Sequence, residues 1–360
     1  MCSEKRPAAL PCGAVDIAGR FDDPSRGDIC DVAGIRVGHH QRTAGKWRTG
    51  TTVVFAPDGA VAAVDVRGGA PGSRETDALQ PGRLVQRIHA ICLTGGSAFG
   101  LRAADGCMDE LASRGLGHPV GNGTVVPVVP AAVIFDLGRG GDVTCHPTAD
   151  FGRRALRSAR RRPAHGSIGA GTGAVAGGLA GGVGTASTTV TVGESSYRVG
   201  ALMVVNAHGS AIDPDRAMPW ASHHLARRPS ADERRALTTH LDQVMAERAA
   251  ALATPNTTIG VVATDAPLDR VGAGRMATVS HDGLARALAP VHLSVDGDIV
   301  FAMSTAADTD PSLDHRGVDA IATAAAATTA AAIADAMMWA TGRPGCPSLV
   351  DLCPSARREP

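Results

Sequence analysis

The sequence predicts a layered α/β sandwich. Short runs of β-branched and apolar residues have the pattern of strands, and longer stretches with apolar residues three and four apart have the pattern of helices. These patterns alternate along the 360 residues, which is typical of sheets covered by helices. The length allows two domains, but a single large α/β domain is equally permitted.

The strands are predicted from local composition and turn signals. Pro57-Asp58-Gly59 is read as a turn between two strands, and Asp296-Gly297-Asp298 as a hairpin turn. The predicted strands cover residues 51–55, 60–66, 88–93, 188–192, 199–206, 257–264, 276–281, 289–295 and 299–303.

Four helices are predicted from apolar spacing and capping signals. Ser97 is expected to be the N-cap of the first, and Ser230 with Glu233 forms a capping box for the third. The others are an arginine-rich helix and an alanine-rich buried helix. The first helix is expected between Ser97 and Gly115, the second over 153–162, the third from Ser230 toward the break at Pro255, and the fourth over 320–340.

Composition excludes several classes of protein. Acidic and basic residues balance at 35 each, so we expect neither a nucleic-acid partner nor an anionic membrane partner. The N-terminal residues have no apolar signal region, and no run approaches the ~20 apolar residues of a membrane span. The eight cysteines are scattered, which favours reduced thiols in a cytoplasmic protein. No His, Cys, Asp or Glu set has ligand spacing, so we expect neither a metal nor a cofactor.

The most informative stretch runs from Ala253 to Asp265. Pro255 cannot belong to a strand ladder, whereas residues 257–264 read as a buried strand. Thr257 therefore stands at the start of a core strand, directly after a loop. If the Asn256-Thr257 bond were cut, Thr257 would carry a nucleophilic hydroxyl and a free α-amine of pKa about 7.7–8.0, which is suited to act as its base. Strand formation alone is the simpler reading of this threonine.

Three further residues are candidates for the same site. Asn206 closes an apolar strand, which is usual for a turn residue but also suits an amide that faces a reaction centre. Asp296 and Asp298 flank a glycine and lie two apart, so their side chains share one face of an extended chain. Repulsion between two such carboxylates raises the pKa of one of them.

These residues resemble the self-processing aminopeptidase family that includes D-aminopeptidase, β-peptidyl aminopeptidase and the nylon-oligomer hydrolase. The matching segments run in family order from about residue 29 to 340. They are residues 67–72, 93–101, 169–173, 181–187, 205–207, 256–264 and 296–298.

The resemblance implies a four-layer αββα fold like that of the N-terminal-nucleophile hydrolases. It also implies a nucleophile at Thr257, an oxyanion-hole amide at Asn206, and carboxylates at Asp296 and Asp298 beside the nucleophile. The expected domains are a flexible extension over residues 1–28, one catalytic domain over 29–343 and a tail over 344–360. The catalytic domain would be cleaved into an α chain that ends at Asn256 and a β chain from Thr257. A homo-oligomer, a tetramer in the family, is implied as well.

Two positions depart from the family pattern. Family members often have tyrosine where Phe135 aligns and lysine where Ala180 aligns. Loss of one oxyanion donor can cost about 10²–10³ in rate, so either backbone and arginine donors replace these groups or the activity is modest. The remaining pocket candidates come from the matching glycine-rich segment and are Gly95, Gly96 and Ser97.

The sequence leaves several functions open. The first is hydrolysis of small peptides or amides by an aminopeptidase-like enzyme, with the nylon-oligomer (6-aminohexanoate oligomer) endo-hydrolase as an alternative. Acyl transfer on a similar fold, as in the ornithine acetyltransferases, is an alternative of another class, and an uncleaved non-catalytic relative is a third. The substrate is expected to be a small molecule or short peptide that contains an amide bond.

Overall fold

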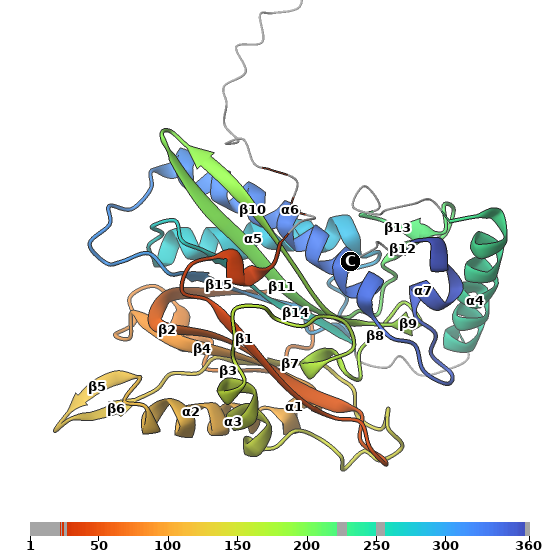
Figure 1. Ribbon diagram of the computed structural model, residues 1–360, viewed down its shortest axis with the longest axis horizontal. Coiled ribbons are helices and arrows are strands. Elements are labelled where there is room, and N and C mark those ends of the chain that lie inside the picture. The colour runs from red at the N-terminus through yellow and green to blue at the C-terminus, as the bar shows by residue number, and fades with distance from the viewer. Residues whose placement is uncertain (1–21, 23, 25–26, 222–228, 250–255, 357–360) are drawn as a thin grey trace, which may run out of the picture.

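A mixed nine-stranded sheet forms the centre of the protein (Figure 1). The computed structural model describes residues 22, 24, 27–221, 229–249 and 256–356. Eight strands follow one another in the order β10-β11-β14-β15-β2-β4-β7-β3, and β1 pairs with β2. The strands are β1 (Arg36–Arg42), β2 (Thr49–Val66), β3 (Ser73–Arg74), β4 (Arg87–Thr94), β7 (Ala131–Val133), β10 (Gly182–Val192), β11 (Ser195–Asn206), β14 (Thr257–Thr264) and β15 (Ile299–Ser304).

Helices and short strand pairs surround this sheet. The helices are α1 (Ser97–Gly100), α2 (Ala103–Ser113), α3 (Ala149–Arg157), α4 (Ala231–Ala249), α5 (Arg270–Ala287), α6 (His315–Trp339) and α7 (Leu349–Leu352). The short strands form the pairs β5 (His118–Gly121) with β6 (Thr124–Val126), β8 (Val175–Ala176) with β9 (Leu179–Ala180), and β12 (Ile212–Asp213) with β13 (Met218–Pro219). Single 3₁₀ turns lie at Ile29–Asp31, Asp77–Leu79, Gly169–Gly171 and Pro354–Ala356.

Three hydrophobic cores separate four layers. Met203 and Val262 belong to the core that also contains Ile321 of α6. Their chain neighbours Leu202 and Val261 point the other way, into a middle core shared with Val54 of β2. A third core contains Phe55 of β2 and Leu111 of α2. The layers are therefore α5 and α6, two halves of the sheet, and α1–α3 (Figure 1), which confirms the predicted αββα sandwich.

The strand β2 joins the two halves of the sheet, and here the sequence prediction was wrong. Residues as far as Phe55 pair with β1, whereas Val61 to Val66 pair with β15. Pro57-Asp58-Gly59 is therefore not a turn. It lies at an irregularity between Phe55 and Ala60 in the pairing with β4, where a residue without a backbone N–H is tolerated.

Two predicted strands beyond β14 do not exist. Residues 276–281 belong to α5, whose buried positions include Met276, Ala277, Ser280 and Leu284. Their spacing of three and four is helical, and a six-residue window could not show it. Residues 289–295 form a connection instead. Asp296-Gly297-Asp298 is therefore not a hairpin turn, because β15 runs parallel to β14 and is reached through α5.

Other predictions are confirmed or adjusted. The capping box at Ser230 and Glu233 is present, and the paired strands β10 and β11 form the predicted hairpin. Ser97 is not an N-cap but the first residue of α1, and Gly96 occupies the cap position. The left-handed φ of +86° at Gly96 suits a residue without a Cβ.

The alanine-rich helix α6 is a core helix. By length and composition it could cross a membrane, but 78% of its most apolar window is buried inside the protein. Among the described residues, α6 is the one helix with the length and composition to cross a membrane.

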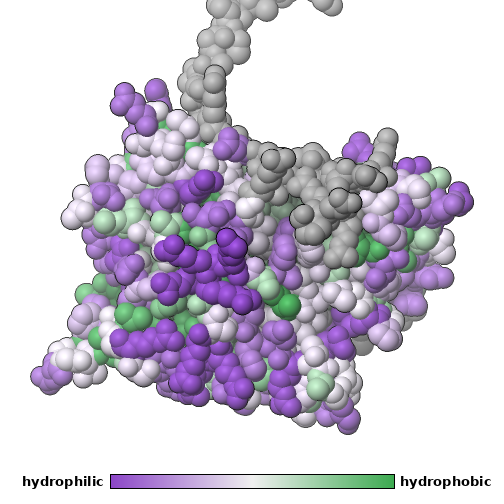
Figure 2. All heavy atoms as spheres, in the orientation of Figure 1, coloured by the Kyte–Doolittle hydropathy of each residue, from purple (hydrophilic) through white to green (hydrophobic). Residues whose placement is uncertain are grey.

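The face shown in Figure 2 is mostly hydrophilic, with hydrophobic residues in small separate groups.

The structure describes most of the predicted C-terminal tail but little of the predicted N-terminal extension. Of residues 1–28, the structure describes only 22, 24, 27 and 28, so the predicted extension lies largely outside the described residues. The predicted tail contains α7, and Leu349 and Cys353 are buried. Its Ser355 donates backbone and side-chain hydrogen bonds to Glu233 of α4, at 2.8 and 2.6 Å. Residues 344–356 thus pack against the body of the protein.

Candidate active site

Strand pairing brings four of the predicted site residues together. Thr257 is the first residue of β14 and lies opposite Asn206, the last residue of β11. Asn256 forms an isolated bridge with Asp296, next to the start of β15. Thr257, Asn206, Asp296 and Asp298 are all at most 6% exposed. The polar groups therefore converge on one buried point where three strands begin or end.

The Thr257 hydroxyl lies against the peptide bond that precedes it. Its Oγ1 donates to the carbonyl oxygen of Asn256 at 2.5 Å. The same carbonyl oxygen accepts the backbone N–H of Gly297 at 3.2 Å. A hydroxyl beside a carbonyl that is polarised by a fixed N–H donor has the parts needed for acyl transfer.

Gly297 is placed where a side chain would not fit. A Cβ added there would lie 2.9 Å from Thr257 Oγ1 and 2.8 Å from the carbonyl oxygen of Ala70. Glycine at this position thus permits close approach to the nucleophile candidate.

Asp298 holds the start of β14. Its Oδ1 accepts the backbone N–H of Thr258 at 2.7 Å. Its Oδ2 accepts the backbone N–H of His292 at 3.1 Å and lies 2.8 Å from Nδ1 of the same histidine. His292 was not predicted from the sequence, because a lone histidine in an irregular segment carries no local signal.

Asp296 is buried beside Asp298. Its Oδ2 accepts the backbone N–H of Leu293 at 3.0 Å. Burial raises the pKa of Asp296, and the negative charge of Asp298 adds to this effect, whereas the Leu293 N–H and the neighbouring His208 act in the opposite direction. Of the two carboxylates, Asp296 is thus the one with the raised pKa, and burial is the main cause.

The glycine-rich loop at residues 67–72 braces this carboxylate pair. Arg67 and Gly68 donate backbone N–H bonds to the carbonyl of Asp298, and Ala70 donates to that of Asp296 at 2.7 Å. A Cβ at Gly68 would lie 2.2 Å from the nitrogen of Asp298. These glycines therefore approach the chain that carries the carboxylates.

Arg139 connects both sides of the candidate cleavage site. It donates to Asn206 Oδ1 and, through Nη2, to Asn256 Oδ1 at 3.3 Å. Asn206 Oδ1 also accepts the N–H of Val175 at 3.0 Å, and its Nδ2 donates to the Phe135 carbonyl at 3.4 Å. Arg139 was not predicted from the sequence, although an arginine between two glycines was the available signal.

A buried carboxylate lies beside the Gly95-Gly96 segment. Asp136 Oδ1 accepts the backbone N–H of Gly96 at 2.6 Å. Burial raises the pKa of Asp136 to about 6, although hydrogen bonds and the charge of Arg139 lower it. A Cβ at Gly95 would lie 2.2 Å from Asp136 Oδ2. The predicted pocket residues Gly95 and Gly96 thus pack on a carboxylate that the sequence analysis did not select.

The other predicted pocket residues contact Asn206 through the backbone or through neighbouring residues. Ser97 donates its backbone N–H to Ile134 at 3.0 Å, and Phe135 meets Asn206 through its carbonyl. Ala180 pairs with Val175 and packs with Ala340 and Cys346. Ala180 is therefore linked to Asn206 through Val175.

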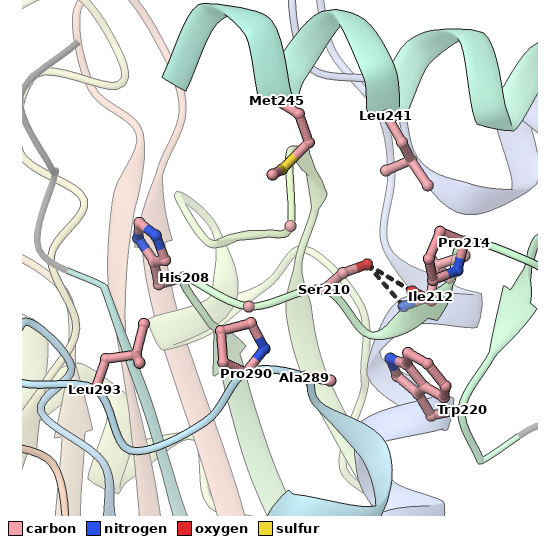
Figure 3. A pocket seen from close by; sticks show the side chains of 12 residues that line it. His208, Ser210, Ile212, Pro214, Trp220, Leu241, Met245, Ala289, Pro290 and Leu293 are labelled. Atoms are coloured by element: carbon pink, nitrogen blue, oxygen red, sulfur yellow. Dashed lines mark hydrogen bonds between the residues drawn. The ribbon is translucent and has the colours of Figure 1, made fainter. Parts of the chain in front are cut away.

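Figure 3 shows a cavity of about 610 Å³ that lies near the candidate site. Two of its lining residues, His208 and Leu293, interact with Asp296. The other lining residues are Gly177, Gly209, Ser210, Ile212, Pro214, Trp220, Leu241, Met245, Ala289 and Pro290. In the described part of the chain, no group of three or more His, Cys, Asp and Glu residues is placed to hold a metal ion.

Comparison with known proteins gives matches over nearly the whole chain. The model of peptidase family S58 matches residues 27–348. An uncharacterized aminopeptidase of Mycobacterium tuberculosis is 44% identical over 348 residues, which cover 91% of this chain and 98% of that protein. The 6-aminohexanoate-oligomer endohydrolase of Paenarthrobacter ureafaciens is 30% identical over 286 residues, 76% of this chain and 74% of that protein.

The fold is also similar to a solved structure. The L-aminopeptidase D-Ala-esterase/amidase of Ochrobactrum anthropi superposes with a TM-score of 0.71 at 22% identity, over 94% of this chain and 95% of that one. That protein has a variant of the Ntn hydrolase fold. The predicted fold is therefore confirmed, and the relatives support a peptidase or amidase activity.

Proposed function

Because this chain belongs to peptidase family S58, we propose that it is an amide hydrolase that cuts itself before Thr257 and then uses Thr257 as an N-terminal nucleophile. One observation supports this proposal above the others. The Thr257 hydroxyl lies 2.5 Å from the carbonyl oxygen of Asn256, and this oxygen accepts the Gly297 N–H. Strand formation alone does not require this arrangement.

Self-cleavage would begin with an N-to-O acyl shift. The Thr257 oxygen attacks the carbonyl carbon of Asn256, the C–O bond forms, and the C–N bond breaks. The hydroxyl proton passes through a nearby carboxylate of the Asp296–Asp298 pair to the departing amine. Water then hydrolyses the ester and leaves a free carboxylate on Asn256 and a free amine on Thr257.

Turnover would use the same groups on an external amide. The freed α-amine takes the proton of the Thr257 hydroxyl as it attacks the substrate carbonyl, and gives it to the leaving amine. Asn206 and backbone N–H groups such as that of Gly297 stabilise the oxyanion. Arg139 orients Asn206 through a direct hydrogen bond, which supports the view that an arginine serves where the family pattern has other donors.

The substrates proposed here are short peptides and small amides. Oligoamides of ω-amino acids are a second class, which the 30% identical 6-aminohexanoate-oligomer endohydrolase supports. Both classes require the same acyl transfer to Thr257.

Two isosteric variants test the nucleophile. Thr257→Val removes the hydroxyl and should leave one chain of full mass by intact-mass spectrometry, with no hydrolysis of alanyl 4-nitroanilide. Thr258→Val is the matched control, because within the described residues Thr258 Oγ1 has no hydrogen-bond partner. It should split into two chains at the normal rate. Splitting of Thr257→Val at the same bond would show that another group is the nucleophile.

A further inference from the structure

The cavity of about 610 Å³ borders the candidate active site through His208 and Leu293, two lining residues that interact with Asp296. His208 follows Asn206 by two residues along the chain that leaves β11, and its proximity lowers the pKa of Asp296. Leu293, at the same end of the cavity, donates its backbone N–H to Asp296 at 3.0 Å. Figure 3 shows the side chains of His208 and Leu293 together at one end, with Trp220 and Pro214 at the other.

The cavity lining is chiefly apolar. Ile212, Leu241 and Pro290 contribute to its walls. The polar Ser210 side chain is already engaged, because its Oγ donates to the Ile212 carbonyl at 3.0 Å and accepts the Ile212 N–H at 2.9 Å. A volume of this size with few polar groups fits an apolar ligand group.

Two large apolar side chains of this lining are open to solvent. Trp220 is 38% exposed and Met245 is 65% exposed. Such side chains on either side of a cavity leave apolar surface that a ligand would remove from water. The cavity is therefore accessible from outside as well as close to the carboxylates.

The direction of the chain indicates which part of a substrate would enter. In self-cleavage Thr257 attacks the carbonyl of Asn256, so the chain before Thr257 is the acyl group. In turnover, the substrate acyl group must reach the same side of the hydroxyl. The last described element before Asn256 is α4, which ends at Ala249, and Leu241 and Met245 of α4 line the cavity.

We propose that this cavity is the acyl-side specificity pocket, and that the preferred substrates are amides whose acyl group carries a bulky apolar chain. This inference rests on the proposed function. Each methylene of the acyl group that enters the cavity should raise kcat/KM about fourfold. Leucyl 4-nitroanilide should therefore exceed alanyl 4-nitroanilide at least tenfold, since the leaving group is the same in both.

Ala289→Phe tests the pocket directly. Ala289 is exposed at the cavity, and its backbone is held by two 2.9 Å hydrogen bonds with Ser210, so a larger side chain must occupy the space. The leucyl preference should fall to near one, because kcat/KM falls much more for leucyl 4-nitroanilide than for the alanyl substrate. Ala285→Phe on the exposed face of α5 is the matched control and should keep the preference. Met245→Glu adds a charge at an exposed site and should lower leucyl hydrolysis selectively.

Binding gives a readout that does not need catalysis. By calorimetry, 2-octanone should bind the wild-type protein at least tenfold more tightly than 2-butanone, and Ala289→Phe should abolish the difference. Chain splitting and alanyl hydrolysis without any leucyl or octanone preference would overturn the pocket while the proposed function stands. Equal hydrolysis of leucyl and alanyl 4-nitroanilide, together with an octanone preference that disappears in Ala289→Phe, would overturn the acyl-side assignment. An unsplit, inactive protein would overturn the proposed function, and ketone binding would still decide the pocket.

Discussion

Replacement of Gly297 by alanine tests the geometry on which self-cleavage depends. The added Cβ would lie 2.9 Å from Thr257 Oγ1 and 2.8 Å from the Ala70 carbonyl oxygen, whereas ordinary contacts begin at about 3.4 Å. Because Ala70 belongs to the loop that braces the carboxylates, the strain must move the Thr257 hydroxyl or the Gly297 N–H by about half an ångström. Either movement separates the hydroxyl from a polarised carbonyl.

The added methyl group should slow self-cleavage strongly. Loss of one oxyanion donor typically costs about 10²–10³ in rate, and a misplacement of about 1 Å can cost about 10². Gly297→Ala should therefore split about 10²-fold more slowly than the wild-type chain. The assay is intact-mass analysis of time points after cell-free synthesis, with circular dichroism to show that the precursor is folded.

A second glycine supplies the control. Gly274 lies in α5, and the nearest atom to an added Cβ is Ala63 Cβ at 4.0 Å. Gly274→Ala should split normally and gain about 0.5–1 kcal/mol of stability from the helical position. If folded Gly297→Ala splits as fast as Gly274→Ala, the proposed role of the Gly297 N–H and the close approach at Thr257 is refuted.

Three other predictions concern charge and metal. Asp296→Asn and Asp298→Asn should each slow splitting and turnover at least tenfold, because an amide does not take the hydroxyl proton; normal rates in both would reduce the pair to a structural role. Activity should be complete after exhaustive chelation, and its loss with rescue by zinc would contradict the metal-free mechanism. The raised pKa of Asp136, about 6, means that the folded state binds more protons than the unfolded state between about pH 4 and 6. Stability should therefore fall by about 2 kcal/mol as pH rises from 4 to 6. Asp136→Asn should flatten this slope in urea titrations, and an unchanged slope would show that another group titrates.

The local sequence was sufficient for the nucleophile candidate and its strand. A β-branched run directly after Pro255 predicts a buried strand that starts at Thr257, and β14 begins at that residue. The Asp296-Gly297-Asp298 motif predicted two carboxylates near one point for the same reason, since strand periodicity and the freedom of glycine are properties of neighbouring residues.

Contacts between distant segments decided the rest of the site. Arg139 meets Asn206 and Asn256, which are 67 and 117 residues away in the chain. No periodicity or spacing links such residues, because their proximity arises only when β11 and β14 pair and the loop before α3 folds over them. Asp136 and His292 likewise lie near the site only because segments distant in the sequence pack together.

The same distinction applies to the fold. Amphipathic spacing identified α2 and α4, and strand composition identified the β10–β11 hairpin. The path of β2 through both halves of the sheet and the helical state of residues 276–281 depended on partners elsewhere in the chain. A short apolar segment fits either a strand or a helix, and tertiary packing selects between them because burial contributes more free energy than local propensity.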